Sequence, residues 1–240
     1  RYKMLSLKNI KKSINGKSIV NDVSFEVSNG TINGLLGPNG AGKTTTFYLI
    51  AGLIKSDEGS IFYFDDNISS LPMHRRSQLG IKYLPQEPSI FQNLTVLENL
   101  QGLAEIALKN KKEIDDFIDK SIEEFNLSEL LKLKGRQLSG GQRRKVEIAR
   151  TLASEPKIIL LDEPFAGIDP IAIDEIKEVL ISLKEKNIGI LITDHNVREA
   201  LEICDKAIVI NNGEIIADGP KEKLINDEIV KKVYLGNMYS

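Results

Sequence analysis

The glycine-rich stretch "GPNGAGKTT" at residues 37–45 constrains the fold of this chain more than any other part of its sequence. It follows an apolar, strand-like run and opens a helical segment, which is the context that a phosphate-binding P-loop requires. Glycines let backbone N–H groups wrap around a phosphate, and the start of the helix adds a favourable dipole. The sequence therefore predicts a nucleotide site formed by Gly37, Pro38, Asn39, Gly40, Ala41, Gly42, Lys43, Thr44 and Thr45.

Two of these side chains have predicted roles of their own. We expect Lys43 to reach the outer phosphates of the nucleotide and Thr44 to offer its hydroxyl to Mg²⁺. P-loops occur in kinases, GTPases, helicases and transport ATPases, so other features must decide between these classes. The Asn-Lys-x-Asp motif with which a GTPase reads guanine is absent from the sequence.

Polar residues close three further apolar strands. Asp162 ends "KIILLD" and is followed by Glu163, while Gln86 and His195 come directly after "IKYLP" and "GILITD". Ligands of an open α/β sheet bind beyond the carboxyl ends of its strands, so we expect these side chains to face one crevice with the P-loop. Asp162 would hold Mg²⁺ through water, and Glu163 would polarise the attacking water. The alternatives are a helix cap for the carboxylates and a structural role for the histidine.

The stretch "LSGGQRRKVEIAR" at 138–150 predicts a second anion site. Ser139 is a good N-cap, and the glycines after it leave the start of the helix bare. One chain has no second phosphate for such a site. The sequence therefore predicts a two-fold dimer in which Ser139, Gly140, Gly141 and Gln142 of one copy close on nucleotide that the other copy holds.

Strand-like and helical segments alternate along most of the chain, as in a parallel sheet. The strands "MLSLKNI", "VSFEV" and "TINGLLG" predict a small β layer at the start, and from about 95 to 135 only helical patterns remain, opened by a capping box of Thr95 and Glu98. The predicted fold is an α/β P-loop NTPase with a mixed sheet core, an N-terminal antiparallel β layer and an inserted α-helical subdomain. We expect a single domain, with the core at 1–86 and 136–217, the helical subdomain at 87–135 and a C-terminal helical extension, "DEIVKKVYLG" included, at 218–240.

Composition excludes several classes of protein. A net charge of -2, with lysines and glutamates mixed along the helices, argues against a nucleic-acid partner. Cys204 is the only cysteine, so a disulfide framework is excluded. No apolar run approaches the roughly 18 residues that a membrane-spanning helix needs.

Taken in order, the P-loop, Gln86, "LSGGQ", "ILLDEP", "AGID" and His195 resemble the nucleotide-binding subunit of ABC transporters, over essentially the whole chain. The resemblance implies ATP and Mg²⁺ as cofactors, with Thr44, Gln86 and Asp162 at the metal. It implies Glu163 as the catalytic base, Gln86 as the residue that links nucleotide to transporter, His195 as the γ-phosphate switch and Asp169 as a contact across the dimer.

Within that family, "YLPQEPSIFQNLTVLENL" and "ITDHNVREAL" are most similar to the ATPases of lipopolysaccharide exporters. Branched-chain amino-acid importer ATPases and soluble, non-transport ABC ATPases are the alternatives. The resemblance implies a homodimer that binds two transmembrane permease subunits at the cytoplasmic face of the inner membrane. The family usually stacks an aromatic residue on adenine, and that position holds Ile14 here; Tyr2 is the alternative.

The stretch "YLPQEPSIFQ" at 83–92 places apolar residues in a loop. We expect Gln86 to face nucleotide, metal and water. We expect Ile90 and Phe91 to be exposed, because Pro88 and Ser89 precede them, and to bind a short helix of a membrane partner. The alternative is that both residues anchor the loop in the core.

Overall fold

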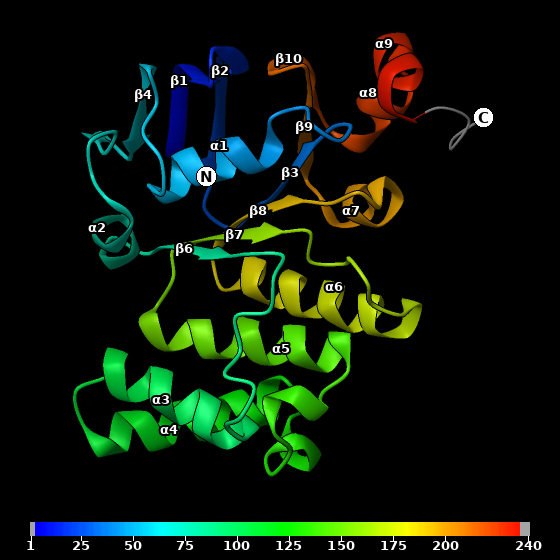
Figure 1. Ribbon diagram of the computed structural model, residues 1–240. Helices are drawn as coiled ribbons and strands as arrows, with labels where there is room; N and C mark the ends of the chain where they lie inside the picture. Colours follow the sequence, from blue (N-terminus) through cyan, green and yellow to red (C-terminus); the bar gives the residue numbers. More distant parts are fainter. Residues whose placement is uncertain (1–2, 236–240) are drawn as a thin grey trace.

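A twisted six-stranded sheet lies at the centre of the computed structural model, which describes residues 3–235 (Figure 1). Its order is β10-β9-β3-β8-β7-β6, and all neighbours are parallel except β10, which turns back antiparallel on β9 through Asn212 and Gly213. The strands are β3 (Ile32–Leu36), β6 (Ile81–Leu84), β7 (Ile158–Asp162), β8 (Gly189–Thr193), β9 (Lys206–Asn211) and β10 (Glu214–Gly219). The predicted mixed sheet is therefore confirmed.

A second sheet, antiparallel with order β2-β1-β4-β5, covers one side of the first (Figure 1). Its strands are β1 (Lys3–Ile14), β2 (Lys17–Ser28), β4 (Glu58–Tyr63) and β5 (Asp66–Asn67). The prediction that "TINGLLG" belongs to this layer is wrong, because β3 lies between β9 and β8 in the central sheet. All five residues of β3 are buried, whereas β2 is partly exposed. A strand buried on both faces needs cover on both sides, which only the central sheet supplies.

Helix α1 (Lys43–Ala51) lies between the two sheets, and the other long helices cover the opposite face of the central sheet (Figure 1). There α5 (Gly140–Thr151) packs beside α6 (Pro170–Glu185), and α3 (Val96–Ala107) and α4 (Lys111–Glu124) pack beyond α5. The remaining helices and turns are α2 (Met73–Gln78), α7 (Val197–Ile203), α8 (Lys221–Ile225), α9 (Glu228–Val230), 3-10 turns at Ser128–Leu130, Gly135–Gln137 and Leu152–Ser154, and a π turn at Lys231–Leu235. No helix within residues 3–235 is long and apolar enough to cross a membrane.

Several local predictions are confirmed. Thr95 and Glu98 form the expected capping box at the start of α3. The predicted C-terminal helix runs from Glu228 as α9 and the π turn, and its last predicted residue, Gly236, lies outside the described residues. Cys204 is the C-cap residue of α7, and burial raises the pKa of its thiol.

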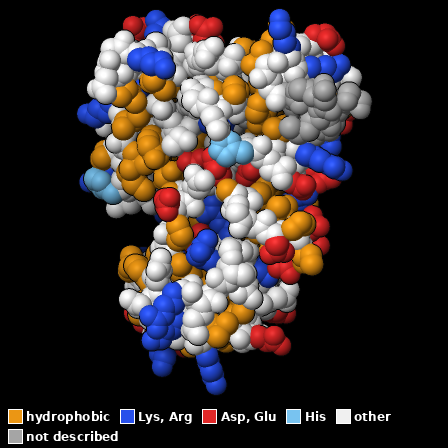
Figure 2. Space-filling view, turned by 45° about the vertical axis from the view of Figure 1, so that its right-hand side comes forward, with side chains coloured by type: hydrophobic (Ala, Val, Ile, Leu, Met, Phe, Trp, Pro, Cys, Tyr) orange, Lys and Arg blue, Asp and Glu red, His pale blue; other side chains and the backbone are white. Residues whose placement is uncertain are grey.

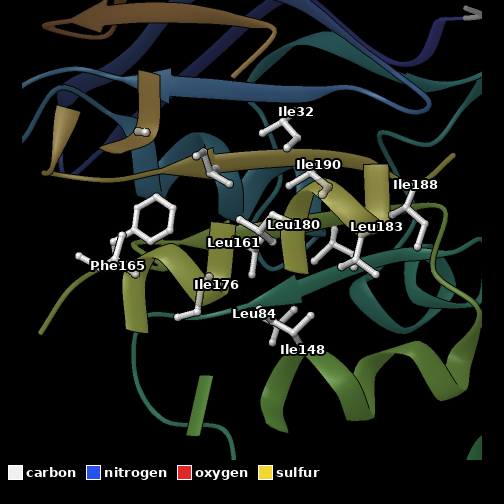
Figure 3. Packing of buried hydrophobic residues seen from close by; sticks show 14 of the residues in the cluster. Ile32, Leu84, Ile148, Leu161, Phe165, Ile176, Leu180, Leu183, Ile188 and Ile190 are labelled. Carbon is white, nitrogen blue, oxygen red and sulfur yellow. The ribbon is translucent and has the colours of Figure 1, made fainter. Parts of the chain in front are cut away.

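Two hydrophobic cores fill the faces of the central sheet. Along β7, Ile158 and Leu160 point to the core that α1 shares with the antiparallel sheet, while Ile159 and Leu161 point to the core beneath α5 and α6. Figure 3 shows Leu161 packed among Leu180, Ile176 and Ile190 in the second core. Each such side chain contributes about 1.5–3 kcal/mol by leaving water. This double burial fixes the carboxyl ends of β6, β7 and β8, where the polar residues lie.

Candidate nucleotide-hydrolysing site

The P-loop follows β3 and leads directly into α1, as the sequence predicts. Gly37 has φ 152, and a Cβ atom there would lie 2.0 Å from the carbonyl oxygen of Ile210. Gly42 is the N-cap of α1 with φ 106, and a Cβ atom there would lie 2.6 Å from the carbonyl oxygen of Ile19. The loop is therefore a narrow cradle between β9 and β2 that only glycine can line at these positions.

Lys43 is buried and curls back over this loop. Its Nζ atom donates to the carbonyl oxygens of Gly37 at 2.7 Å and Pro38 at 3.0 Å. Burial lowers the pKa of Lys43, and the nearby Glu163 carboxylate opposes that shift. Thr44, next in the chain, is exposed, whereas the hydroxyl of Thr46 is used within α1. Lys43 and Thr44 thus lie at the P-loop end of α1, and their roles toward phosphate and Mg²⁺ stay predictions.

Asp162 ends β7 with its carboxylate buried. Its two oxygens accept hydrogen bonds from the hydroxyls of Thr193 at 3.0 Å and Tyr83 at 3.1 Å. Asp162 forms no ion pair within residues 3–235, although the charges of Lys43 and Arg144 act on it, and a buried carboxylate whose oxygens accept only from neutral hydroxyls can also bind a metal cation. No group of three or more His, Cys, Asp or Glu side chains in the described part of the chain could hold a metal alone. Mg²⁺ would therefore need nucleotide oxygens as well, which is its usual mode of binding.

Glu163 lies beside His195 and has a left-handed backbone, with φ 48. Its Oε1 atom is 2.5 Å from Nε2 of His195. Its Oε2 atom is buried and has no hydrogen-bond partner among the described residues. Burial raises the pKa of Glu163, Asp162 and Asp194 add to the rise, and the charges of His195 and Lys43 oppose it. An unpartnered carboxylate oxygen of raised basicity is suited to accept a proton from water.

We expect kcat for ATP hydrolysis to decrease as the pH is lowered, because the Glu163 base must be ionised. The midpoint of this acid limb should lie above pH 4.5, the ordinary pKa of a glutamate, because the pKa of Glu163 is raised. The charge that His195 carries when protonated lowers the pKa of Glu163, so His195→Gln should move the acid limb further up in pH. A pH–rate profile of both proteins tests this. An acid limb at or below 4.5 in the wild type would contradict the assignment.

Asp194, which the sequence analysis did not single out, connects two loops of the site by hydrogen bonds. Its carboxylate is buried and accepts the backbone N–H of Phe165 at 2.9 Å and of Asn196 at 2.7 Å. Burial raises its pKa. It thereby joins the loop that carries Glu163 to the loop that carries His195. Its place at the end of "GILITD" was a signal, but only the fold shows which backbone groups it holds.

Ser139 and Asp169 lie in a second group, at the starts of α5 and α6. Ser139 and Gln142 form a capping box, and Asp169 caps α6 by accepting from the N–H of Ala172 at 3.1 Å. A Cβ atom on Gly141 would lie 2.3 Å from Cβ of Ala172, so the two helix starts are in close contact. Neither Asp162 nor Glu163 caps a helix, so the alternative that these two carboxylates serve as a helix cap is excluded.

The predicted site residues are thus divided between two groups. Lys43, Asp162, Glu163 and His195 gather around the ends of β3, β7 and β8, and Figure 2 shows acidic side chains beside a histidine where the surface is hollowed. Gln86 is exposed on the loop after β6. Ile14 is 43% exposed at the end of β1, and Tyr2 lies outside the described residues. The roles that the sequence analysis assigned to the residues of both groups, and to Gln86, Ile14 and Tyr2, stay predictions.

The loop after Gln86 corrects one prediction. Ile90 is only 4% exposed and belongs to the core between β6, α3 and α5, so it is not part of an exposed pair. Phe91 is 50% exposed, as predicted. The two residues are neighbours in an irregular backbone that turns one side chain inward and the other outward, which their sequence does not indicate.

A P-loop between two sheets, with a carboxylate pair at the next parallel strand and a histidine beside the second carboxylate, defines a nucleoside triphosphatase cassette. A model of the ABC transporter family matches residues 20–166. The chain belongs to this family and is an ABC-type ATPase.

Relatives and solved structures are similar over nearly the whole chain. The lipopolysaccharide export system ATP-binding protein LptB of Haemophilus influenzae is 52% identical over 98% of both chains, and that of Escherichia coli K12 is 49% identical over 97% of both. A crystal structure of an ATP-binding cassette of an ABC transporter in its ADP conformation has a TM-score of 0.90 at 32% identity, covering 98% of this chain and 100% of the other. A bacterial cassette solved as a dimer has a TM-score of 0.79 at 25% identity, covering 91% and 99%.

Proposed function

We propose that the chain is the ATP-hydrolysing subunit of a lipopolysaccharide exporter, a peripheral protein at the cytoplasmic face of the inner membrane. The relatives of about 50% identity, which match 97–98% of its length, support the substrate. The observation that carries the chemistry is the Glu163 carboxylate, with one oxygen against His195 and the other buried with no hydrogen-bond partner in the described part of the chain. The proposed division into a core at 1–86 and 136–217, a helical subdomain at 87–135 and an extension at 218–240 is part of this proposal.

Hydrolysis follows from the side chains at the strand ends. The P-loop amides and Lys43 would bind and orient the phosphates, and Thr44, Gln86 and Asp162 would hold Mg²⁺. The metal, when bound, neutralises negative charge on the phosphates. Glu163 takes the proton of the attacking water on its unpartnered oxygen. His195 holds the other oxygen and thereby fixes the orientation of the base.

The second group of predicted residues serves a homodimer in this proposal. Ser139, Gly140, Gly141, Gln142 and Asp169 would close on nucleotide that the P-loop of the partner copy holds. The start of α5 supports this, because Ser139 is exposed and the two glycines after it carry no side chains, while Asp169 is exposed at the adjoining start of α6. The dimeric cassette among the similar structures offers a precedent.

A groove beside Phe91 is the proposed docking place for the permease subunits. It has a volume of about 280 Å³, lies between α2, β6 and α3, and is lined mainly by apolar side chains, among them Met73, Tyr83, Leu103 and Ile106. Arg150 forms part of its wall, and its guanidinium lies 5.3 Å from the ring centre of Phe91. An apolar groove with an exposed aromatic side chain at its edge suits a short helix.

Phe91→Ala tests this proposal. We expect partner binding to weaken about thirtyfold, because a buried aromatic anchor at an interface is worth about 2 kcal/mol or more. ATPase activity of the isolated chain should stay near normal, since Phe91 does not touch the P-loop or Glu163. The measurement is the amount of membrane protein that co-purifies with the tagged chain from native membranes, identified by mass spectrometry.

The matched control is Phe64→Ala. Phe64 is 51% exposed, close to the 50% of Phe91, but lies in the turn after β4 on the other side of the molecule. Equal losses of partner in both variants, or loss of the isolated ATPase in Phe91→Ala, would contradict the docking role. The identity of the retained membrane proteins separates a lipopolysaccharide exporter from an amino-acid importer, and retention of none favours a soluble ATPase.

A further inference from the structure

The loop between β6 and α3 has an irregular backbone, so its buried polar groups need partners outside regular structure. The N–H groups of Ser89 and Ile90 both donate to Oε1 of Glu147, at 2.7 and 3.2 Å. Glu147 lies on α5 and is 2% exposed. One carboxylate oxygen of α5 therefore holds two consecutive amides of this loop.

Two further buried side chains form hydrogen bonds with the backbone of this loop. Asn99, on α3, accepts from the N–H of Phe91 at 2.9 Å and donates to the carbonyl oxygen of Phe91 at 3.0 Å. Arg150, on α5, donates to the carbonyl oxygen and to the hydroxyl of Ser89, the latter at 2.9 Å. Residues 89–91 are thus fixed by side chains of α3 and α5, although β6 lies closer to them in sequence.

Glu147 also connects this loop to the catalytic strand. Its second oxygen accepts from Nη1 of Arg144 at 3.2 Å, and Arg144 donates to the carbonyl oxygens of Pro85 at 3.0 Å and Asp162 at 2.9 Å. Arg144, Glu147 and Arg150 follow one another at three-residue spacing, on one face of α5. The carboxylate has both oxygens bonded, which is the condition under which a buried charge is tolerated.

We propose that Glu147 is a positioning residue that sets the shape of residues 89–91, turning Ile90 inward and Phe91 outward, and that links this loop to α5. Because Ser139 caps the start of α5, this helix connects residues 89–91 to the predicted dimer contact. The role in partner docking rests on the proposed function, whereas the role in shaping the loop stands apart from it. A permease helix that presses on Phe91 would then act on α5 through Glu147.

The first experiment measures hydrogen exchange of backbone amides in the full chain. Glu147→Leu removes the acceptor, so we expect the amides of Ser89 and Ile90 to exchange at least about tenfold faster while the amides of β7 and α1 keep their rates. Glu175→Leu is the control, because Glu175, on α6, pairs with Lys145 of α5 at 2.8 Å and has no hydrogen bond or ion pair to residues 89–91 among the described residues, so this variant removes a different carboxylate partner of α5. Unchanged exchange at Ser89 and Ile90 in Glu147→Leu would overturn the proposal.

Glu147→Leu leaves Arg144 without its buried partner and could prevent folding, so Glu147→Gln provides a second variant. Glutamine keeps an acceptor oxygen and loses the charge, and we expect a rise of about threefold in the same two exchange rates. Thermal unfolding of each variant checks that the fold is retained. Rates in Glu147→Gln equal to those of the wild type and of Glu175→Leu would overturn the proposal.

The second experiment is a double-mutant cycle with Phe91→Ala, read as the membrane protein retained on the tagged chain. Glu147→Leu alone should lower retention at least about fivefold, or Glu147→Gln about twofold if only that variant folds, with no further loss in the Phe91→Ala background. Fully additive losses would overturn the link to docking. If the wild-type chain retains no membrane protein, the proposed function fails, and the exchange rates still decide the role of Glu147.

Discussion

Glu163→Gln should lower the rate of ATP hydrolysis by about 10² to 10⁴, the range expected when a general base is removed. The amide cannot accept the proton of water, yet Lys43 and the P-loop amides remain to bind phosphate. Nucleotide should therefore stay bound, and the variant should elute as a dimer with ATP and as a monomer without it. Steady-state kinetics and size-exclusion chromatography measure the two effects.

The control for this prediction is Glu178→Gln, an exposed glutamate on α6. It should hydrolyse ATP at the wild-type rate. A Glu163→Gln protein that remains active would show that another group takes the proton. A protein that is inactive but monomeric with and without ATP would contradict the proposed dimer and leave the base assignment intact.

Gly37→Ala should abolish nucleotide binding. The added Cβ atom would lie 2.0 Å from the carbonyl oxygen of Ile210, so either β9 or the P-loop must move. Relief of a 2.0 Å contact requires a displacement of roughly 1 Å or more, which misplaces the amides that bind phosphate. We expect the affinity for ATP to fall at least about 100-fold, since several charge-assisted hydrogen bonds of about 1.5–3 kcal/mol each are lost together. Isothermal titration with ATP is the measurement.

Gly16→Ala is the control for Gly37→Ala, because it separates the effect of a steric clash from the effect of backbone strain. Gly16 also has a positive φ, of 77, but a Cβ atom there would meet nothing within 4 Å. We expect it to lose about 1–2 kcal/mol of stability from the left-handed backbone alone while binding ATP normally. Wild-type affinity in Gly37→Ala would show that the cradle can widen, which would contradict the geometric argument.

Much of the catalytic group could be predicted because its signals are local. The P-loop shows in nine consecutive residues, and Asp162, Glu163 and His195 each end a short apolar strand. Parallel strands bring their carboxyl ends to one edge, so a polar residue at each end is sufficient evidence for a shared crevice. Tyr83 lacked such a signal, and the place of Asp194 at the end of "GILITD" did not indicate its role, because their partners, the Asp162 carboxylate and the N–H of Phe165, are distant in sequence.

The strand and loop assignments that failed depended on non-local burial. The sequence "TINGLLG" is compatible with an edge strand and with a central strand. Only the burial of both faces of β3 in the tertiary structure shows that it lies between β9 and β8. The same holds for Ile90, whose apolar side chain gave no indication of whether the loop would bury it.

By itself, the sequence determined the fold class, the P-loop, the strand ends that carry the acidic residues and the histidine, and the starts of α3 and α5. Each of these depends on contacts between near neighbours, such as a cap, a turn or a strand period. Only the tertiary structure decided that one oxygen of Glu163 has no partner within residues 3–235, that Asp194 joins two loops, and that Glu147 holds the loop before Phe91. These outcomes depend on which buried polar groups meet across elements far apart in the chain, and a buried group must find its partner wherever packing leaves one.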